Sequence, residues 1–122
     1  MLKTEFKERM KGLLGDDFEA FLAALEGDPV RGARVNRIKT SPEHFLSLTD
    51  FAFEPLPYLD NGFILRDGEG VGRSPEHHAG MIYMQDPGAM SALSALDFIE
   101  GEWVLDMCAA PGGKSSQIAE RI

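Results

Sequence analysis

The segment from Trp103 to Ser115 constrains the fold of this chain more than any other part of the sequence. Its first three residues, Trp103-Val104-Leu105, are all apolar and predict a buried strand. A loop of small residues follows, and Gly112-Gly113 lead into a helix that begins near Lys114. A strand, a tight loop and a helix in this order are typical of the start of a parallel α/β unit.

The loop between this strand and helix has the composition of a ligand site. Such loops lie at the carboxyl end of a parallel strand, where α/β folds bind nucleotide-type ligands. Backbone N–H groups at the start of the next helix can hold an anionic group such as a carboxylate, and Asp106 can accept a hydrogen bond. The alternative is a tight turn without a ligand. The small residues that let a ligand approach the backbone argue against it: Ala109, Ala110, Gly112 and Gly113.

A phosphate-binding loop is the main competing interpretation, because Gly113-Lys114-Ser115 resembles the end of the GxxxxGK[ST] pattern. That pattern requires glycine at the position of Cys108. Pro111 would also remove an N–H donor from the middle of a phosphate cradle. The sequence therefore excludes the phosphate-binding loop.

The preceding residues predict an α+β unit. We expect helices over 4–14 and 18–25, with Thr4 as the first N-cap and Asp16 opening a capping box, and with the Phe and Leu stripes of both helices in the core. Ser41-Pro42 and Asp86-Pro87 predict helices to Leu48 and to about Asp97. The remaining predictions are strands over 33–38, 62–65 and 81–84, an irregular segment over 50–60 and a flexible Gly-rich loop over 67–75.

Composition limits the class of protein. The 122 residues contain one cysteine, Cys108, which excludes an internal disulfide framework and fits a reducing cytoplasm. No apolar run is long enough to span a membrane, and charged residues from Lys3 to Lys11 exclude a signal peptide. His77 and His78 lack metal-ligand spacing relative to Cys108. We therefore expect a cytoplasmic protein without a membrane segment or a metal.

The net charge of −8 is unevenly distributed. Residues 1–45 carry eight basic and eight acidic side chains, whereas residues 46–122 carry four and twelve. The neutral part contains a cluster of cations with no acidic residue from Pro29 to Pro42, namely Arg31, Arg34, Arg37 and Lys39. Such a cluster can contact phosphates, although charge alone favours a solvated edge.

Three segments together resemble a known family. The string from Leu105 to Ser115 resembles the first motif of the Sun-type RNA cytosine-5 methyltransferases, with its Asp-x-Cys-Ala-Ala-Pro-Gly-Gly-Lys loop. Residues 33–39 and 80–90 resemble the Arg-x-Asn-x-x-Lys and Gly-x-x-Tyr-x-Gln segments of that family. Residues 76–80 are most similar to the bacterial branch that methylates small-subunit ribosomal RNA.

The resemblance implies a truncated enzyme, with an α+β RNA-engaging domain over 1–100 and the first strand, loop and helix of a Rossmann-like methyltransferase domain over 101–122. It implies S-adenosylmethionine as cofactor and C5 of a ribosomal RNA cytosine as the methylated atom. The cofactor loop would be Cys108, Ala109, Ala110, Pro111, Gly112, Gly113 and Lys114. RNA would contact Arg34, Asn36, Arg37 and Lys39. The family's nucleophilic cysteine lies in later motifs, so no catalytic residue is expected here, and a noncatalytic RNA-binding module is the alternative.

Overall fold

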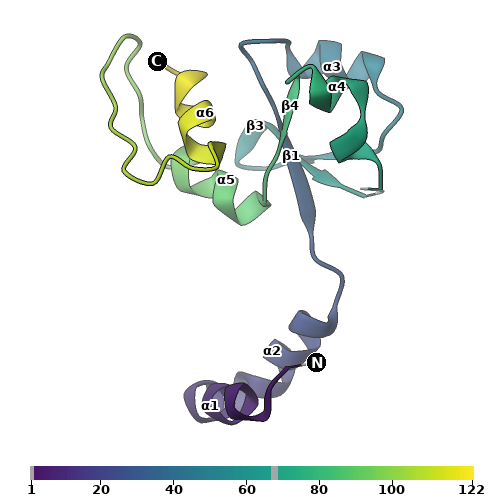
Figure 1. Cartoon of the computed structure of the whole chain (residues 1–122), viewed down its shortest axis with the longest axis vertical. Coiled ribbons are helices and arrows are strands. Elements are labelled where there is room, and N and C mark those ends of the chain that lie inside the picture. Colours follow the sequence, from purple (N-terminus) through teal and green to yellow (C-terminus); the bar gives the residue numbers. More distant parts are fainter. Residues whose placement is uncertain (1, 67–68) are drawn as a thin grey trace.

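The computed structural model describes residues 2–66 and 69–122. Its centre is a four-stranded antiparallel sheet in the order β2-β3-β1-β4. The strands are β1 (Arg31–Val35), β2 (Phe53–Leu56), β3 (Leu59–Leu65) and β4 (Ile82–Met84). In Figure 1, α3 (Pro42–Leu48) and α4 (Pro75–His78) lie on one side of the sheet, with α5 (Pro87–Ser94) and α6 (Gly113–Ala119) on the other. The expected α+β class is confirmed.

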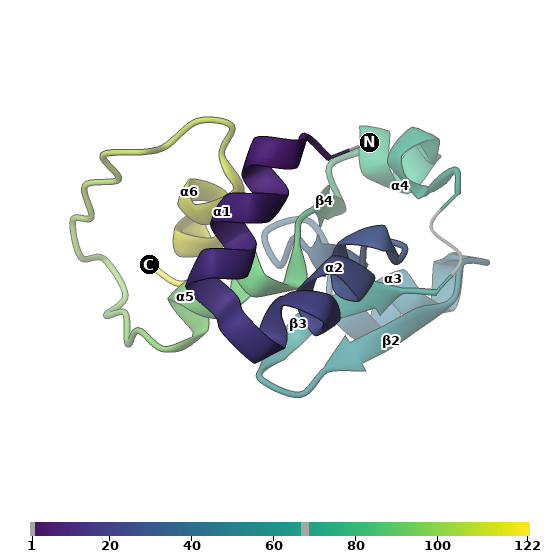
Figure 2. The same ribbon diagram turned by 90° about the horizontal axis from the view of Figure 1, so that it is seen from below.

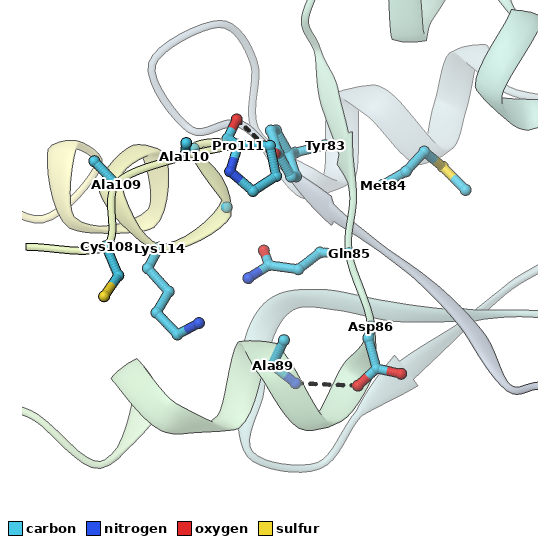
Figure 3. Close-up of a pocket in the computed structure, with 12 residues that line it drawn as sticks. Tyr83, Met84, Gln85, Asp86, Ala89, Cys108, Ala109, Ala110, Pro111 and Lys114 are labelled. Atoms are coloured by element: carbon cyan, nitrogen blue, oxygen red, sulfur yellow. Dashed lines mark hydrogen bonds between the residues drawn. The ribbon is translucent and has the colours of Figure 1, made fainter. Parts of the chain in front are cut away.

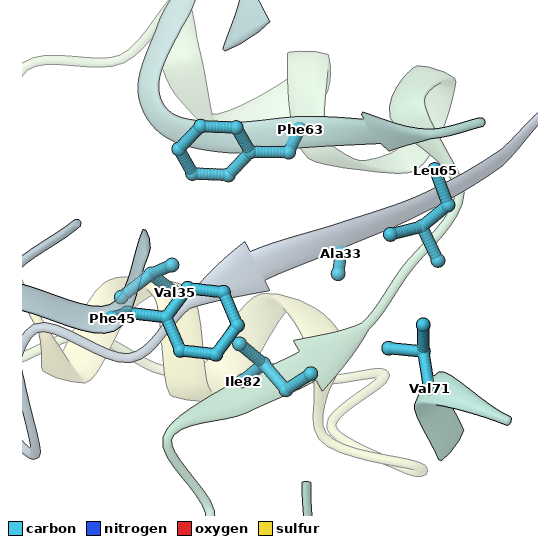
Figure 4. Packing of buried hydrophobic residues seen from close by; sticks show 7 residues of the cluster. All are labelled: Ala33, Val35, Phe45, Phe63, Leu65, Val71 and Ile82. Carbon is cyan, nitrogen blue, oxygen red and sulfur yellow. The ribbon is translucent and has the colours of Figure 1, made fainter. Parts of the chain in front are cut away.

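The central strand β1 is buried on both faces. Ala33 and Val35 point into the main core, which Figure 4 shows together with Phe45, Phe63, Leu65, Val71 and Ile82. Gly32 and Arg34 belong to the opposite face, toward α5 and α6. A Cβ on Gly32 would lie 2.7 Å from the backbone oxygen of Gln85, so only glycine lets the chain pass this closely.

The strand expected over 33–38 begins and ends earlier than its alternation suggested. Asn36 closes a turn directly after Val35: its Nδ2 donates to the Gly80 oxygen at 2.9 Å, and its Oδ1 accepts from the Ile38 N–H at 3.1 Å. These side-chain bonds compete with strand pairing, which is why the strand stops there.

Two of the four expected helix caps are present. The Ser41 hydroxyl accepts from the His44 N–H, and the Asp86 carboxylate accepts from the Ala89 N–H, each at 3.1 Å. The caps at Thr4 and Asp16 are wrong. The helix α1 (Thr4–Leu14) already includes Thr4, and a 3-10 turn over Gly15–Asp17 leads into α2 (Phe18–Glu26) without a side-chain cap.

The segment expected to be irregular over 50–60 contains β2 and the start of β3, so that prediction is wrong. Pro55 is accommodated because β2 is an edge strand, where a missing N–H does not interrupt a ladder on both sides. The pairing shifts register between Pro55 and Leu56. Of the Gly-rich loop expected over 67–75, residues 67–68 lie outside the described residues. The rest is ordered around the buried Val71, in a 3-10 turn over Val71–Arg73.

The first two helices lie apart from the sheet in Figure 1, and Figure 2, seen from below, shows them in front of it. Their apolar stripes were expected in the core, and this is wrong for all but Phe18. The rings of Phe6 and Phe21 contact each other with centroids 6.4 Å apart, whereas Leu13 and Leu25 are 68% and 48% exposed. Helical periodicity predicts that one face is apolar, but it does not specify what covers that face.

The strand expected at Trp103-Val104-Leu105 is absent, and these residues form an irregular, exposed segment. Trp103 is fully exposed and Leu105 is 84% exposed. A strand requires a neighbour to satisfy its backbone groups, and within residues 2–66 and 69–122 no strand pairs with this segment. The helix expected after Gly112-Gly113 is confirmed as α6.

Candidate functional site

The helix α6 packs against α5 and thereby positions the loop that precedes it. Gln117 is buried and donates from Nε2 to the Met90 oxygen at 3.2 Å. Arg121 donates from Nη1 to the Leu93 oxygen at 2.7 Å. These two bonds satisfy backbone acceptors of α5 and hold α6 in place. As a result, residues 108–114 lie against the end of β4 and the start of α5.

A cavity of about 240 Å³ lies between these two segments (Figure 3). One wall contains all seven residues that the sequence indicated for a cofactor: Cys108, Ala109, Ala110, Pro111, Gly112, Gly113 and Lys114. The opposite wall contains residues that the sequence did not single out as site residues, namely Tyr83, Met84, Gln85, Asp86 and Ala89. In the sequence, only the resemblance of residues 80–90 to a family segment pointed to this wall. That resemblance assigned no role to any of its side chains.

Short-range hydrogen bonds hold the loop in shape. Asp106 accepts from the Cys108 N–H at 2.9 Å and from the Ser115 hydroxyl at 2.6 Å, so one carboxylate ties both ends of the loop together. The Ser115 bond, with the Cys108 N–H adding to it, lowers the pKa of Asp106. Gly112 has a φ of 111°, which favours glycine at this position.

Tyr83 connects the two walls of the cavity. Its hydroxyl donates to the Pro111 oxygen at 3.1 Å, which links β4 to the loop. Cys108 is exposed and belongs to the loop itself. A chemical role for its thiol is not needed to explain its position.

Arg34 is not available to RNA, so its prediction as an RNA contact is wrong. Its side chain is fully buried, and it forms an ion pair with Glu120, whose side chain is 3% exposed. It also donates from Nε to the Gln85 Oε1 at 3.2 Å and from Nη2 to the Ser116 hydroxyl at 2.7 Å. Burial lowers the pKa of Arg34 to about 10, which still leaves the guanidinium charged at neutral pH.

The other three residues predicted to contact RNA differ in accessibility. Asn36 is half-buried, and both ends of its amide are used to close the turn after β1. Arg37 is exposed and forms an ion pair with Asp60 at 2.7 Å, both side chains being largely in solvent. Lys39 is exposed on the same turn. Arg37 and Lys39 therefore remain accessible to a polyanion.

Within residues 2–66 and 69–122, no group of three or more His, Cys, Asp or Glu side chains is arranged to hold a metal ion. None of the helices described there is both long and apolar enough to cross a bilayer.

Comparison with known proteins gives consistent matches. Residues 2–87 match the family model described as the N-terminal domain of 16S rRNA methyltransferase RsmF. Proteins named ribosomal RNA small subunit methyltransferase F from Escherichia coli O1:K1 and Citrobacter koseri are each 39% identical over 129 residues, covering 98% of this chain. The chain spans 26% of the length of these curated relatives.

Solved structures agree with the sequence matches. A methyltransferase homologue from Pyrococcus horikoshii superimposes with a TM-score of 0.80 at 34% identity, covering 98% of this chain and 40% of that one. A second solved structure has a TM-score of 0.79 at 28% identity, covering 94% of this chain and 27% of that one. The sheet and helices described above are thus shared with solved proteins, one of which is described as a methyltransferase homologue.

Proposed function

Because the chain belongs to the family of N-terminal domains of 16S rRNA methyltransferase RsmF, we propose that it forms part of an S-adenosylmethionine-dependent ribosomal RNA (cytosine-5) methyltransferase. The observation that carries the proposal is the cavity in which residues 108–114 face the end of β4 and the start of α5. In this arrangement residues 1–100 engage RNA and residues 101–122 begin the cofactor domain. A cytoplasmic location belongs to the same proposal.

The residues of the loop fit the proposed cofactor. Ala109 and Ala110 present small side chains to the cavity, and Gly112 adopts a backbone conformation that side chains rarely tolerate. The cavity of about 240 Å³ is slightly smaller than typical ligand pockets of about 300–1,000 Å³, so the described residues enclose one portion of the cofactor. The cofactor, when bound, supplies the methyl group.

Cofactor binding is tested with the glycine of the loop. Isothermal titration of S-adenosylmethionine into the wild-type chain should show binding, and Gly112→Ala should weaken it about tenfold because the φ of 111° strains a side chain. The matched control is Gly12→Ala on α1, where an added Cβ meets nothing within 4 Å. Absence of binding to the wild-type chain would overturn the proposed function.

RNA binding is tested with the accessible cations. The double variant Arg37→Ala, Lys39→Ala should bind a small-subunit ribosomal RNA helix more weakly, with the salt dependence reduced by about one unit of slope per lost phosphate contact. The control variant Lys3→Ala, Lys11→Ala removes the same charge elsewhere, from the residue that precedes α1 and from α1 itself. Binding of RNA without any binding of S-adenosylmethionine would instead favour a noncatalytic RNA-binding module.

A further inference from the structure

Gln85 is the most buried polar side chain of the cavity wall formed by β4 and α5. It is 9% exposed, and its backbone N–H donates to the Gly32 oxygen at 3.1 Å, which fixes the residue to the central strand. In Figure 3 its side chain points from the end of β4 into the cavity, toward the loop that contains Lys114.

The orientation of the Gln85 amide follows from its neighbour. A guanidinium has only donors, so the group that faces the Arg34 Nε at 3.2 Å must be the carbonyl oxygen Oε1. The NH₂ group therefore occupies the other side, against the loop. Its nitrogen lies 3.2 Å from the position that a Cβ on Gly113 would take. Arg34 cannot rotate away, because Glu120 and Ser116 hold its other nitrogens.

The Nε2 group of Gln85 has no acceptor within residues 2–66 and 69–122, although the side chain is nine-tenths buried. Its partner must therefore come from solvent or from a ligand in the cavity. Because the amide is oriented in advance, a ligand acceptor placed there binds without the entropic cost of ordering the side chain.

We propose that Gln85 recognises the target pyrimidine by donating its Nε2–H to an acceptor on the base edge, O2 or N3, and that Arg34 is the positioning residue that orients this amide. The proposal rests on the proposed function. Methyl donor and methyl acceptor must meet in one cavity, and residues 108–114 form the wall assigned to the donor. Gln85 belongs to the opposite wall, so the ligand group that it faces is the methyl acceptor, the base. Enzymes that modify a base inside such a pocket read its edge through hydrogen bonds.

The first experiment follows the side-chain amide of Gln85 by NMR in the ¹³C,¹⁵N-labelled wild-type chain, its signal being assigned through bonds from the backbone of the same residue. With S-adenosylmethionine present, cytidine monophosphate should shift the Gln85 NH₂ signal. Gln117 is an internal control, because its Nε2 already donates to the Met90 oxygen and its signal should stay in place. A Gln85 signal that responds to S-adenosylmethionine alone, or to neither compound, overturns the proposal.

The second experiment measures affinities by titration. Gln85→Glu keeps an oxygen for Arg34 but removes the donor, so the affinity for cytidine monophosphate should fall at least tenfold while that for S-adenosylmethionine is retained. Ser91→Ala, an exposed change on α5, should alter neither affinity. Equal cytidine monophosphate affinity of wild type and Gln85→Glu overturns the inference alone, whereas failure of S-adenosylmethionine to bind the wild type overturns the proposed function. If Gln85→Glu does not fold, as judged by circular dichroism, the wild-type NMR titration still decides.

Discussion

The role of a single residue in this chain depends more on its burial and its contacts than on its charge. Arg34 and Arg37 are three residues apart in one basic cluster, yet the first is fully buried and the second is exposed. Arg34 lies in the central strand with its side chain beneath α6, whereas Arg37 lies in the turn beyond that strand. The same side-chain chemistry therefore serves internal structure at one position and remains accessible to RNA at the other.

The buried ion pair leads to a stability prediction. Arg34→Ala should lower the free energy of unfolding by about 3–5 kcal/mol, because it leaves the buried Glu120 carboxylate without its cationic partner. The matched control is Arg66→Ala, which breaks an ion pair with Glu54 in which both side chains are about half exposed, and which should lower the free energy by less than about 1 kcal/mol. Urea unfolding followed by circular dichroism measures both. Equal losses would show that the Arg34 pair is not structurally more important than a surface pair.

The hydrogen bonds of Asp106 lead to a pH prediction. They favour the ionised carboxylate and lower its pKa, so their stabilisation is present above the ordinary pKa and is lost as the pH falls through the lowered one. Ser115→Ala removes the bond that contributes most, so the pKa of Asp106 should rise toward its ordinary value. Carboxyl ¹³C NMR measures the titration, with Ser91→Ala as the control. An unchanged titration of Asp106 in Ser115→Ala would contradict the assigned cause.

At the scale of elements, the predicted N-caps fall into two groups. Some are determined by the local sequence, and others depend on the surrounding structure. Ser41 and Asp86 each precede a proline at the first helical position, and both cap as expected. Thr4 and Asp16 have the right side chains but lack that proline, and neither caps. Proline holds the backbone in the helical range and leaves the preceding residue extended, which is the conformation that an N-cap requires.

The two kinds of helix start predict different costs on mutation. Ser41→Ala should lower the free energy of unfolding by about 1 kcal/mol, because it removes the bond from the His44 N–H at the start of the helix that carries the core residue Phe45. Asp16→Ala removes no cap and should stay within about 0.5 kcal/mol. Both are compared in one denaturant series. A loss of similar size in Asp16→Ala would mean that the capping box forms in solution.

At the scale of the whole molecule, the cavity depends on two parts of the chain that are distant in sequence. The loop over 108–114 meets the end of β4 because α6 packs on α5 and the buried Arg34 bonds to Ser116 and Glu120. Residues 103–105, by contrast, are not covered by another of the described segments, and their apolar side chains are exposed. The chain spans 26% of the length of its curated relatives, and its single cysteine lies in the loop.

We predict that these 122 residues alone do not methylate RNA. Cytosine C5 becomes nucleophilic only after a thiolate adds to C6, and Cys108 belongs to the wall proposed for the cofactor. The measurement is incorporation of label from S-adenosylmethionine into small-subunit ribosomal RNA, with the full-length Escherichia coli relative as positive control. Incorporation above background that disappears in Cys108→Ser would contradict both the prediction and the role given to this cysteine.

The sequence by itself determined those features that depend on local interactions. The proline-preceded caps, the strand over Ile82–Met84 and the glycine-rich entry to α6 follow from side chains a few residues apart. The seven residues of the loop were also indicated by the sequence, through four small side chains and through the resemblance to a known family motif. Whether they bind S-adenosylmethionine stays a prediction.

Only the tertiary structure decided the features that depend on which other segment packs against a given residue. It buried Arg34 beneath α6 and left the stripes of α1 and α2, apart from Phe18, outside the buried core. Among residues 2–66 and 69–122 it placed no strand beside residues 103–105. It also brought Gln85 into the cavity and set the direction of its amide through Arg34. Periodicity specifies which side of an element is apolar or polar, but burial, pairing and hydrogen-bond direction are properties of two surfaces in contact. For that reason they could not be inferred from either segment alone.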